Sequence, residues 1–272
     1  METTKRVFVK DVWPEVYASY QSRGILQWPV TGVEQHTLKN GDIEEDVLCL
    51  IVSREDSKGM IPLHETGITV DEKQHVNRSR LAALLGQPVS FVVTYVSQRE
   101  GFFTASRSMA MKKMAANIWP SLKEGQVRTA IARRVKFHEA EVEINGVIAS
   151  LPSSELTHAK LTDARKIVKP GDVFDVKIIG VDHDNQKLVV SIKDFVPDPW
   201  ADVKYVEGGI YAGVVTGFTP RYGIFVNLEP GVDVLCWPLK FGEVKKGDGV
   251  KVVVDRIDME KRRMSGKVRS VV

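Results

Sequence analysis

Short segments in which apolar and polar residues alternate follow one another along most of the chain. In the C-terminal third, five such segments are rich in β-branched residues and are separated by Gly, Pro and Asp. They predict strands at about 210–218, 222–228, 232–237, 250–257 and 263–268. Five short strands with little helix are typical of a small closed barrel.

The same order of elements occurs three times: a Gly-bearing segment, an apolar strand, a hydrophilic turn and a second strand. The three copies are LLGQPVSFVVTYVSQREGFFTASRS, VKPGDVFDVKIIGVDHDNQKLVVSIKD and VKKGDGVKVVVDRIDMEKRRMSGKV. Their ends, Ser106, Ser191 and Lys267, are roughly 80 residues apart, which is too long for a solenoid unit and fits a complete small domain. The repeat is therefore a repeat of whole domains.

We expect an all-β protein of tandem five-stranded barrels joined by short linkers, with a short N-terminal helix. The segment DVWPEVYASYQSRG predicts that helix, with Asp11 as its cap, Gly24 as its end and an apolar stripe that packs on the first barrel. A helix that binds a partner is the alternative. The expected ranges are a helical segment at 1–24, a first barrel at 25–107, a linker helix at 108–120, a second barrel at 121–195, a linker at 196–202 and a third barrel at 203–272.

Composition adds the distribution of charge and excludes several kinds of site. The net charge is only +3, but basic residues outnumber acidic ones between Lys204 and Arg269, so a polyanion should bind best to the C-terminal third. Cys49 and Cys236 are far apart and the six histidines are scattered, so we expect no metal, no cofactor and no catalytic site. The apolar runs are too short for a membrane span and the N-terminus lacks a secretory signal, which favours the cytoplasm.

The third repeat contains the stretch RYGIFVNLEPGVDVLCW and, in its last hairpin, Asp258 five residues before Arg263. With these phrases it resembles the S1 RNA-binding domain, a five-stranded OB-fold barrel that is repeated in the largest protein of the small ribosomal subunit. The resemblance implies that bases stack on three rings and that Arg263 contacts phosphate. The RNA-binding candidates are Tyr222, Phe225, Trp237, Asp258, Arg263, Arg221 and Lys267.

The alternation within that stretch supports an outward position for the rings. Ile224, Val226 and Leu228 form the inward face of their strand, which turns Phe225 outward, and a bulge at Gly223 would also bring Tyr222 to the outer face. Two alternatives remain at this point. Trp237 could close the core beside Pro238, and Asp258 with Arg263 could form only a hairpin salt bridge.

The second repeat loses most of this platform. Matching its inward residues Ala140, Val142 and Ile144 to the third repeat puts His138 and Glu141 at the ring positions. Matching the phrase NGVIASL instead puts Phe137 and Ala140 there; we favour the first register because it preserves the alternation. The weaker candidates in this repeat are Phe137, His138 and Lys187, with Pro152 at the His position and Asp182 at the Asp position. Arg133, Arg134 and Lys136 form a basic cluster that is an alternative second groove.

The first repeat departs further, with Pro62, Ser97 and Phe102 at the corresponding positions and an acidic charge balance. We therefore expect a non-catalytic protein, a monomer, that binds single-stranded RNA in translation or RNA handling, mainly through the third barrel. The first two barrels would dock on the small ribosomal subunit or on another protein. The alternative function is an adaptor that docks on a ribosomal or polymerase surface and does not bind RNA by itself.

Overall fold

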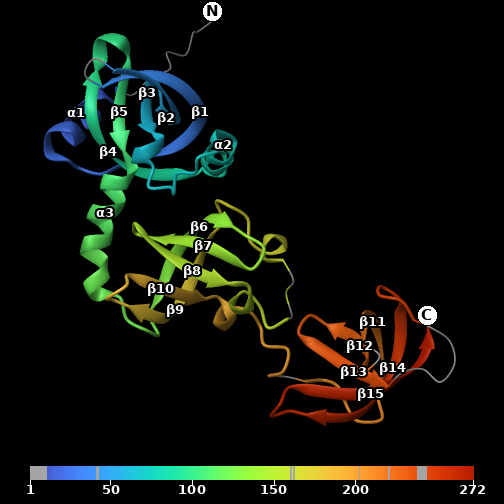
Figure 1. Ribbon diagram of the computed structural model, residues 1–272. Helices are drawn as coiled ribbons and strands as arrows, with labels where there is room; N and C mark the ends of the chain where they lie inside the picture. The colour runs from blue at the N-terminus through green and yellow to red at the C-terminus, as the bar shows by residue number, and fades with distance from the viewer. Residues whose placement is uncertain are drawn as a thin grey trace, which may run out of the picture. The chain divides into compact units, whose positions relative to one another are not determined.

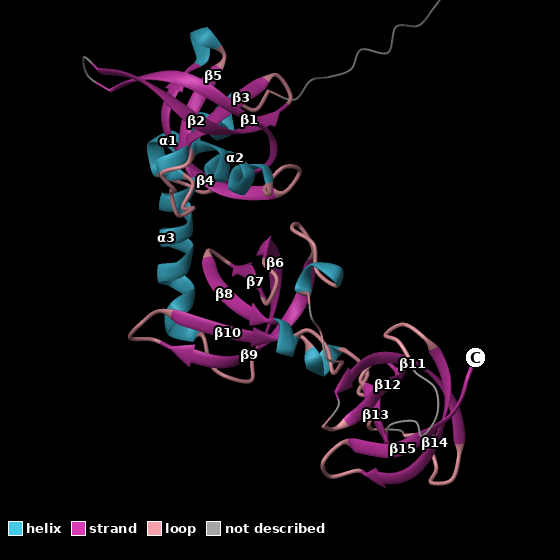
Figure 2. Cartoon of the chain, turned by 45° about the vertical axis from the view of Figure 1, so that its right-hand side comes forward, coloured by secondary structure: helices cyan, strands magenta, loops and turns pink. Residues whose placement is uncertain are grey.

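A computed structural model describes residues 11–40, 43–159, 161, 163–201, 203–219, 221–237 and 244–272, without the side chains of 38–40 and 43–45. Within these ranges the chain forms three closed five-stranded barrels, as the sequence predicts (Figure 1). Strands dominate and helices are few and short (Figure 2). In the described ranges, no helix has the length and apolar character needed to cross a membrane.

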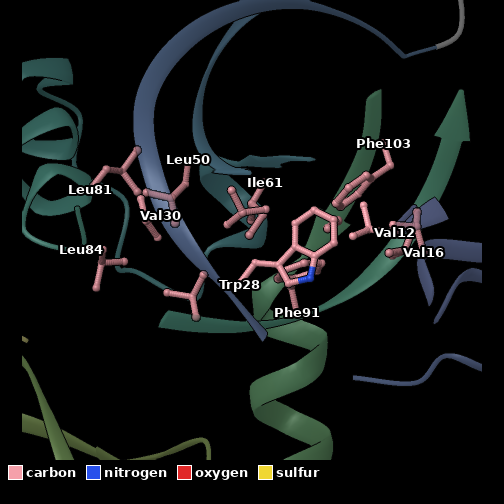
Figure 3. Packing of buried hydrophobic residues seen from close by; sticks show 14 residues of the cluster. Val12, Val16, Trp28, Val30, Leu50, Ile61, Leu81, Leu84, Phe91 and Phe103 are labelled. Carbon is pink, nitrogen blue, oxygen red and sulfur yellow. The ribbon is translucent and has the colours of Figure 1, made fainter. Parts of the chain in front are cut away.

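The first barrel has the strand order β1-β2-β3-β5-β4. Its interior is centred on three aromatic rings, Trp28, Phe91 and Phe103, all of them at most 1% exposed (Figure 3). The Trp28 ring meets each of the two phenyl rings edge-on, at centroid distances of 5.8 and 5.3 Å. The bounds of its elements are α1 Trp13–Ser22, β1 Leu26–Asn40, β2 Ile43–Arg54, β3 Ser57–Pro62, α2 Gln74–Ala82, β4 Pro88–Ser97 and β5 Phe102–Ser106.

Helix α1 packs on the first barrel through Val12 and Val16, which are buried in the same core. The N-cap is Val12 and not Asp11 as predicted, although the Asp11 carboxylate accepts a hydrogen bond from the backbone N–H of Trp13 (3.0 Å). The predicted apolar stripe consists of Val12, Trp13, Val16, Tyr17 and Tyr20, and it is only partly correct, because Tyr17 and Tyr20 are more than a third exposed. The helix also ends one residue earlier than expected, since Arg23 and not Gly24 adopts the left-handed conformation (φ 56°).

The second barrel has the order β10-β8-β7-β6-β9 and follows helix α3. Helix α3 begins at Arg107, and the hydroxyl of Ser106 caps it by accepting a hydrogen bond from the N–H of Met109 (3.0 Å). The bounds of the elements are α3 Arg107–Ile118, β6 Val127–Val135, β7 Glu139–Ile144, β8 Val147–Pro152, β9 Val173–Asp182 and β10 Lys187–Ser191.

The third barrel has the order β11-β12-β13-β15-β14. Trp200, in the range that the sequence assigns to a linker, is 7% exposed and belongs to the core of this barrel, where its Nε1 donates to the carbonyl of Gly231 (2.9 Å). The bounds are β11 Ile210–Thr219, β12 Gly223–Glu229, β13 Val232–Trp237, β14 Gly249–Asp258 and β15 Arg263–Val271. Short 3₁₀ turns occupy Leu63–Glu65, Gln98–Glu100, Trp119–Ser121, Ser153–Glu155, Ala164–Lys166 and Lys193–Phe195.

The chain divides into two compact units, residues 1–151 with 164–190 and residues 152–163 with 191–272. In the first unit a buried ion triad joins the first two barrels. Glu143 on β7 accepts hydrogen bonds from Arg107 of α3 (2.6 Å) and from Arg133 of β6 (2.8 Å). Arg107 also donates to the carbonyl of Thr66, and Arg133 donates to Gln87 and to the carbonyl of Pro88, all in the first barrel. The triad therefore fixes the two barrels to one another.

Candidate nucleic-acid interface

Strand β12 shows the predicted alternation. Ile224 and Val226 are buried at 2% and 0% exposure, whereas Phe225 between them is half-buried on the outer face. Leu228 packs against the same core from its edge, next to a register change between Asn227 and Glu229. The outer face of β12 thus presents Phe225 in the middle of the strand.

Tyr222 is outside the barrel, but not because of a bulge at Gly223. The pairing of β12 with β11 changes register at Thr216, and its pairing with β13 changes register at Leu228. Neither change lies at Gly223, so the predicted bulge is wrong. Gly223 instead has φ +118°, and a Cβ there would lie 2.2 Å from the carbonyl oxygen of Cys236. This left-handed, crowded position requires glycine and lets the chain turn Tyr222 into solvent, where it is 59% exposed.

The Tyr222 ring has a cation next to it. The guanidinium carbon of Arg221 lies 5.5 Å from the ring centroid, within the range of a cation–π contact. The ring also lies in the turn that joins β11 to β12, where the backbone N–H of Tyr222 donates to the carbonyl of Thr219 (3.1 Å). Arg221 and Tyr222 together form a flat, positively charged end of the surface.

Trp237 lies at the end of β13 and is 72% exposed. Its strand alternates like β12, with Val234 and Cys236 fully buried, so Trp237 falls on the outer face. The alternative that Trp237 closes the core is therefore wrong; Pro238, its supposed neighbour there, lies outside the described residues. Trp237 is in register with Lys267 of the parallel neighbour β15, so the two residues lie on adjacent strands.

Asp258 and Arg263 face one another across the β14–β15 hairpin. They do not form the alternative salt bridge: among the described residues, the carboxylate of Asp258 accepts from the backbone N–H of Lys261 (2.9 Å), and Arg263 is exposed. Lys267 is 3.5 Å from Asp255, but both side chains are well exposed, so solvent screens this pair. Arg263 and Lys267 therefore remain accessible to a polyanion.

The register of the barrel adds residues that sequence reasoning missed. Phe225 pairs with Leu235, Leu235 with Ser265, and Ser265 with Arg256, so one row leads from the ring to a guanidinium on β14. Arg256 reaches this row because a register change leaves Asp255 unpaired in the ladder. Phe218, at the end of β11, is a further exposed ring (55%). In the sequence, only the aromatic character of Phe218 indicates a possible binding residue. The position of Arg256 depends on a register change that no local sequence pattern reveals.

The corresponding face of the second barrel carries ion pairs in place of rings. Ala140, Val142 and Ile144 are all buried, which supports the preferred register and excludes Ala140 from the outer face. The side chain of Glu141 does lie on the outer face of the barrel, where its carboxylate is 2.6 Å from the ammonium of Lys136. Lys136 also contacts Glu139 at 2.5 Å. These hydrogen bonds raise the pKa of Lys136 and lower the pKa of Glu139.

The weaker candidates of the second barrel come from two parts of that barrel, the turn before β7 and the hairpin of β9 and β10. Phe137 is 47% exposed and its ring meets that of His138 edge-on at 4.7 Å, with the guanidinium carbon of Arg165 5.4 Å from its centroid. Lys187 is exposed at the start of β10. Asp182 ends β9, and hydrogen bonds from Asn185 lower its pKa.

The basic cluster of the second repeat is not a free groove. Arg133 is 6% exposed and belongs to the ion triad with Glu143. Arg134 and Lys136 both contact Glu141, at 3.8 and 2.6 Å. Burial removes Arg133 from the alternative second groove, and Arg134 and Lys136 are left as partly exposed cations that share Glu141.

The first barrel carries a cleft of about 1030 Å³ with an apolar floor that includes Met60 and Phe102. Phe102 pairs in register with Ser97, and the Tyr95 ring lies 6.5 Å from the Phe102 ring. The cleft also contains Lys58, but its ammonium lies 2.6 Å from Glu34, which lowers the pKa of that carboxyl. Pro62, at the family's His position, ends β3 at the same cleft.

Comparison with known proteins gives a family match on the second barrel and relatives that cover more of the chain. The family model described as S1 RNA binding domain matches residues 121–193, which is the second barrel, although the third repeat carries the phrases quoted above. The 4-hydroxy-3-methylbut-2-enyl diphosphate reductase of Clostridium tetani is 35% identical over 58% of this chain, and that of Clostridium acetobutylicum is 28% identical over 81%. The small ribosomal subunit protein bS1 of Pseudomonas aeruginosa is 31% identical over 67%.

This chain spans only part of each relative: 27% and 38% of the lengths of the two reductases and 35% of the ribosomal protein. A match over 81% of the chain takes in parts of all three barrels. The family match covers one complete barrel, and the other two have the same strand number and closure. Residues 121–193 therefore belong to the S1 RNA binding domain family, in a chain that forms three tandem five-stranded barrels.

Proposed function

We propose that this chain binds single-stranded RNA, without catalysis, in translation or RNA handling, and that the third barrel provides the main binding surface. One observation carries the proposal: Tyr222 and Trp237 are 59% and 72% exposed on a barrel whose core is otherwise complete. Contact of large aromatic rings with water is unfavourable, so exposed rings that share one surface indicate a binding site. Bases would stack on these rings, and Phe225 would extend the platform between them.

The cations around the rings complete the proposed site. Arg221 lies against Tyr222, Lys267 is in register with Trp237, and Arg263 is exposed further along β15. Such groups neutralise backbone phosphates without reading the sequence of the bases. Asp258 keeps the hairpin turn in place through its bond to the backbone of Lys261, which fixes the position of Arg263.

The second barrel would take a smaller part in RNA binding. Its family match covers the whole barrel, but Glu141 and Glu139 occupy the outer face with Lys136. A carboxylate at a stacking position repels phosphate, so Phe137, His138 and Lys187 are left as a minor site. The reductase activity in the names of two relatives belongs to those proteins, and we propose no catalysis here.

A second candidate function is protein docking through the first barrel. The cleft there is largely apolar, and Glu34 neutralises its Lys58, which disfavours a polyanion. We propose that the chain acts as a monomer in the cytoplasm, and that this barrel contacts a protein such as one of the small ribosomal subunit. An adaptor without RNA affinity would leave the third-barrel rings without a role.

The division of labour can be tested with two fragments. A fragment of residues 196–272 should keep most of the affinity for poly-U, and a fragment of residues 1–195 should bind poorly. The cut at 195 leaves β10 with the second barrel and keeps Asp198 and Trp200 with the third barrel. Equal affinities in a fluorescence titration would contradict the assignment of the main site to the third barrel.

Salt dependence tests the proposed chemistry in the complete chain. With about three phosphate contacts on the platform, each adding roughly 0.7 to the slope, a fourfold rise in salt should weaken binding by a factor of at least about 20. Poly-U and poly-C should bind within a few-fold of one another, because stacking accepts any base. An affinity that does not change with salt would rule out phosphate neutralisation as a main contribution.

A further inference from the structure

A groove on the third barrel lies apart from the residues that the proposed function uses. It covers parts of β11, β14 and β15 and measures about 460 Å³. Its lining consists of Ile210, Tyr211, Ala212, Lys251, Arg269 and Ser270. Two of these six side chains are cationic and none is acidic.

A β-bulge in β15 produces this arrangement. Lys251 of β14 pairs with Ser270, and the next residue, Val252, pairs with Val268, so Arg269 is an extra residue in β15. A bulge interrupts the alternation of side chains. Val268 is buried at 9% exposure, and both Arg269 and Ser270 are exposed. The irregularity therefore brings a guanidinium and a hydroxyl next to the ammonium of Lys251.

The two cations of the groove have no acidic partner in the described part of the chain: neither Lys251 nor Arg269 takes part in an ion pair there. Lys267, two residues before Arg269 on the same strand, differs in this respect because Asp255 lies 3.5 Å away. Two like charges that line one groove repel each other, and an anion between them would relieve the repulsion. The groove is thus suited to an anion.

The groove and the RNA-binding platform share strand β15. Arg263, Lys267 and Arg269 are exposed along β15, and Trp237 is in register with Lys267. At about 3.3 Å per residue, the strand carries these cations over about 20 Å. β14 and β15 are paired along this whole length.

We propose that the groove is a second phosphate-binding site for the same single-stranded RNA, whose backbone leaves the rings across β15 and passes between Lys251 and Arg269. The proposal rests on the proposed function of the third barrel. The groove offers charge and the Ser270 hydroxyl but little for stacking, because the Tyr211 ring packs edge-on against Tyr205 and its hydroxyl accepts from the N–H of Val206. It therefore lengthens the RNA that is bound and adds no base preference.

The test uses the full chain with Lys251→Gln and Arg269→Gln combined, and oligo-U of 4 and 12 nucleotides. The double variant should bind the 12-mer about tenfold more weakly at low salt, with a salt slope smaller by roughly 1.4, the share of two phosphates on a single strand. Its affinity for the 4-mer, which the platform alone can hold, should stay within twofold. Lys112→Gln with Lys123→Gln, two exposed lysines of the first unit, is the charge-matched control and should change neither affinity.

The outcomes separate the groove from the platform. If the double variant matches the wild type on the 12-mer in affinity and slope, the groove proposal is wrong while the proposed function stands. An equal loss on both lengths, or an equal loss in the control, also overturns it, since a local groove would not act in that way. If the wild type binds neither oligomer, the proposed function itself fails. Melting temperatures of all variants show whether each one is folded.

Discussion

Glu143→Ala should destabilise the first compact unit by about 3 to 5 kcal/mol, the largest effect that we expect from one polar substitution. Glu143 is 5% exposed and is the shared acceptor of Arg107 and Arg133, which are themselves 3% and 6% exposed. Its removal leaves two guanidinium groups buried without a counter-charge. Burial already lowers the pKa of Arg107, and Glu143 opposes that effect, so the variant loses the group that offsets the cost.

Hydrogen exchange on the full chain can localise this loss. Protection should fall in β6 and β7, whereas β12 and β13 of the third barrel should keep the wild-type protection. Glu141→Ala is a matched control on the same strand, because Glu141 is half-exposed, and it should cost at most about 1 kcal/mol. Equal loss of protection in the two variants would mean that the triad adds no more than a surface pair.

Trp237→Ala should reduce the affinity for single-stranded RNA by about 1 to 3 kcal/mol, or roughly 5- to 150-fold. The melting temperature should hardly change, because a ring that is 72% exposed contributes little to folding. Trp237→Phe keeps a stacking ring and should recover most of the affinity. Both quantities can be measured on one preparation by RNA titration and a thermal melt.

Val226→Ala is the core control for this experiment. Val226 has no exposed surface, so its truncation should cost about 0.5 to 3 kcal/mol of stability without a direct effect on RNA binding. If Trp237→Ala melts as early as Val226→Ala and the folded fraction binds RNA normally, Trp237 is a structural residue. Tyr222→Ala should behave like Trp237→Ala, since it is also exposed and is held outside by Gly223.

The strands of the third barrel could be predicted within one or two residues, apart from the end of β15. Their alternation is regular, and Gly, Pro and Asp mark the turns between them, so local chemistry determines where each strand begins and ends. The outward position of Phe225 followed from the same alternation. Tyr222 was also placed outside, but for a wrong reason, because the positive φ of Gly223 depends on its contact with Cys236 in another strand.

Features that depend on distant residues could not be predicted. Arg133 belongs by sequence to a basic cluster, but its partner Glu143 and its acceptor Gln87 come from other elements. Trp200 lies in a Pro-rich segment typical of a linker. The acceptor of its indole N–H, the carbonyl of Gly231, lies far away in the sequence, so its burial could not be predicted locally. The bulges that expose Arg256 and Arg269 likewise follow from strand pairing.

Closure of the barrels has a consequence for folding. In tandem proteins, similar neighbours meet at a high local concentration, and exposed strand edges then pair with the wrong repeat or exchange segments. In each barrel described here the last two strands complete the ring, in the third through the parallel pairing of β13 with β15. A completed barrel has no unpaired edge to offer to its neighbour. Misassembly between repeats is therefore confined to the period before each ring closes.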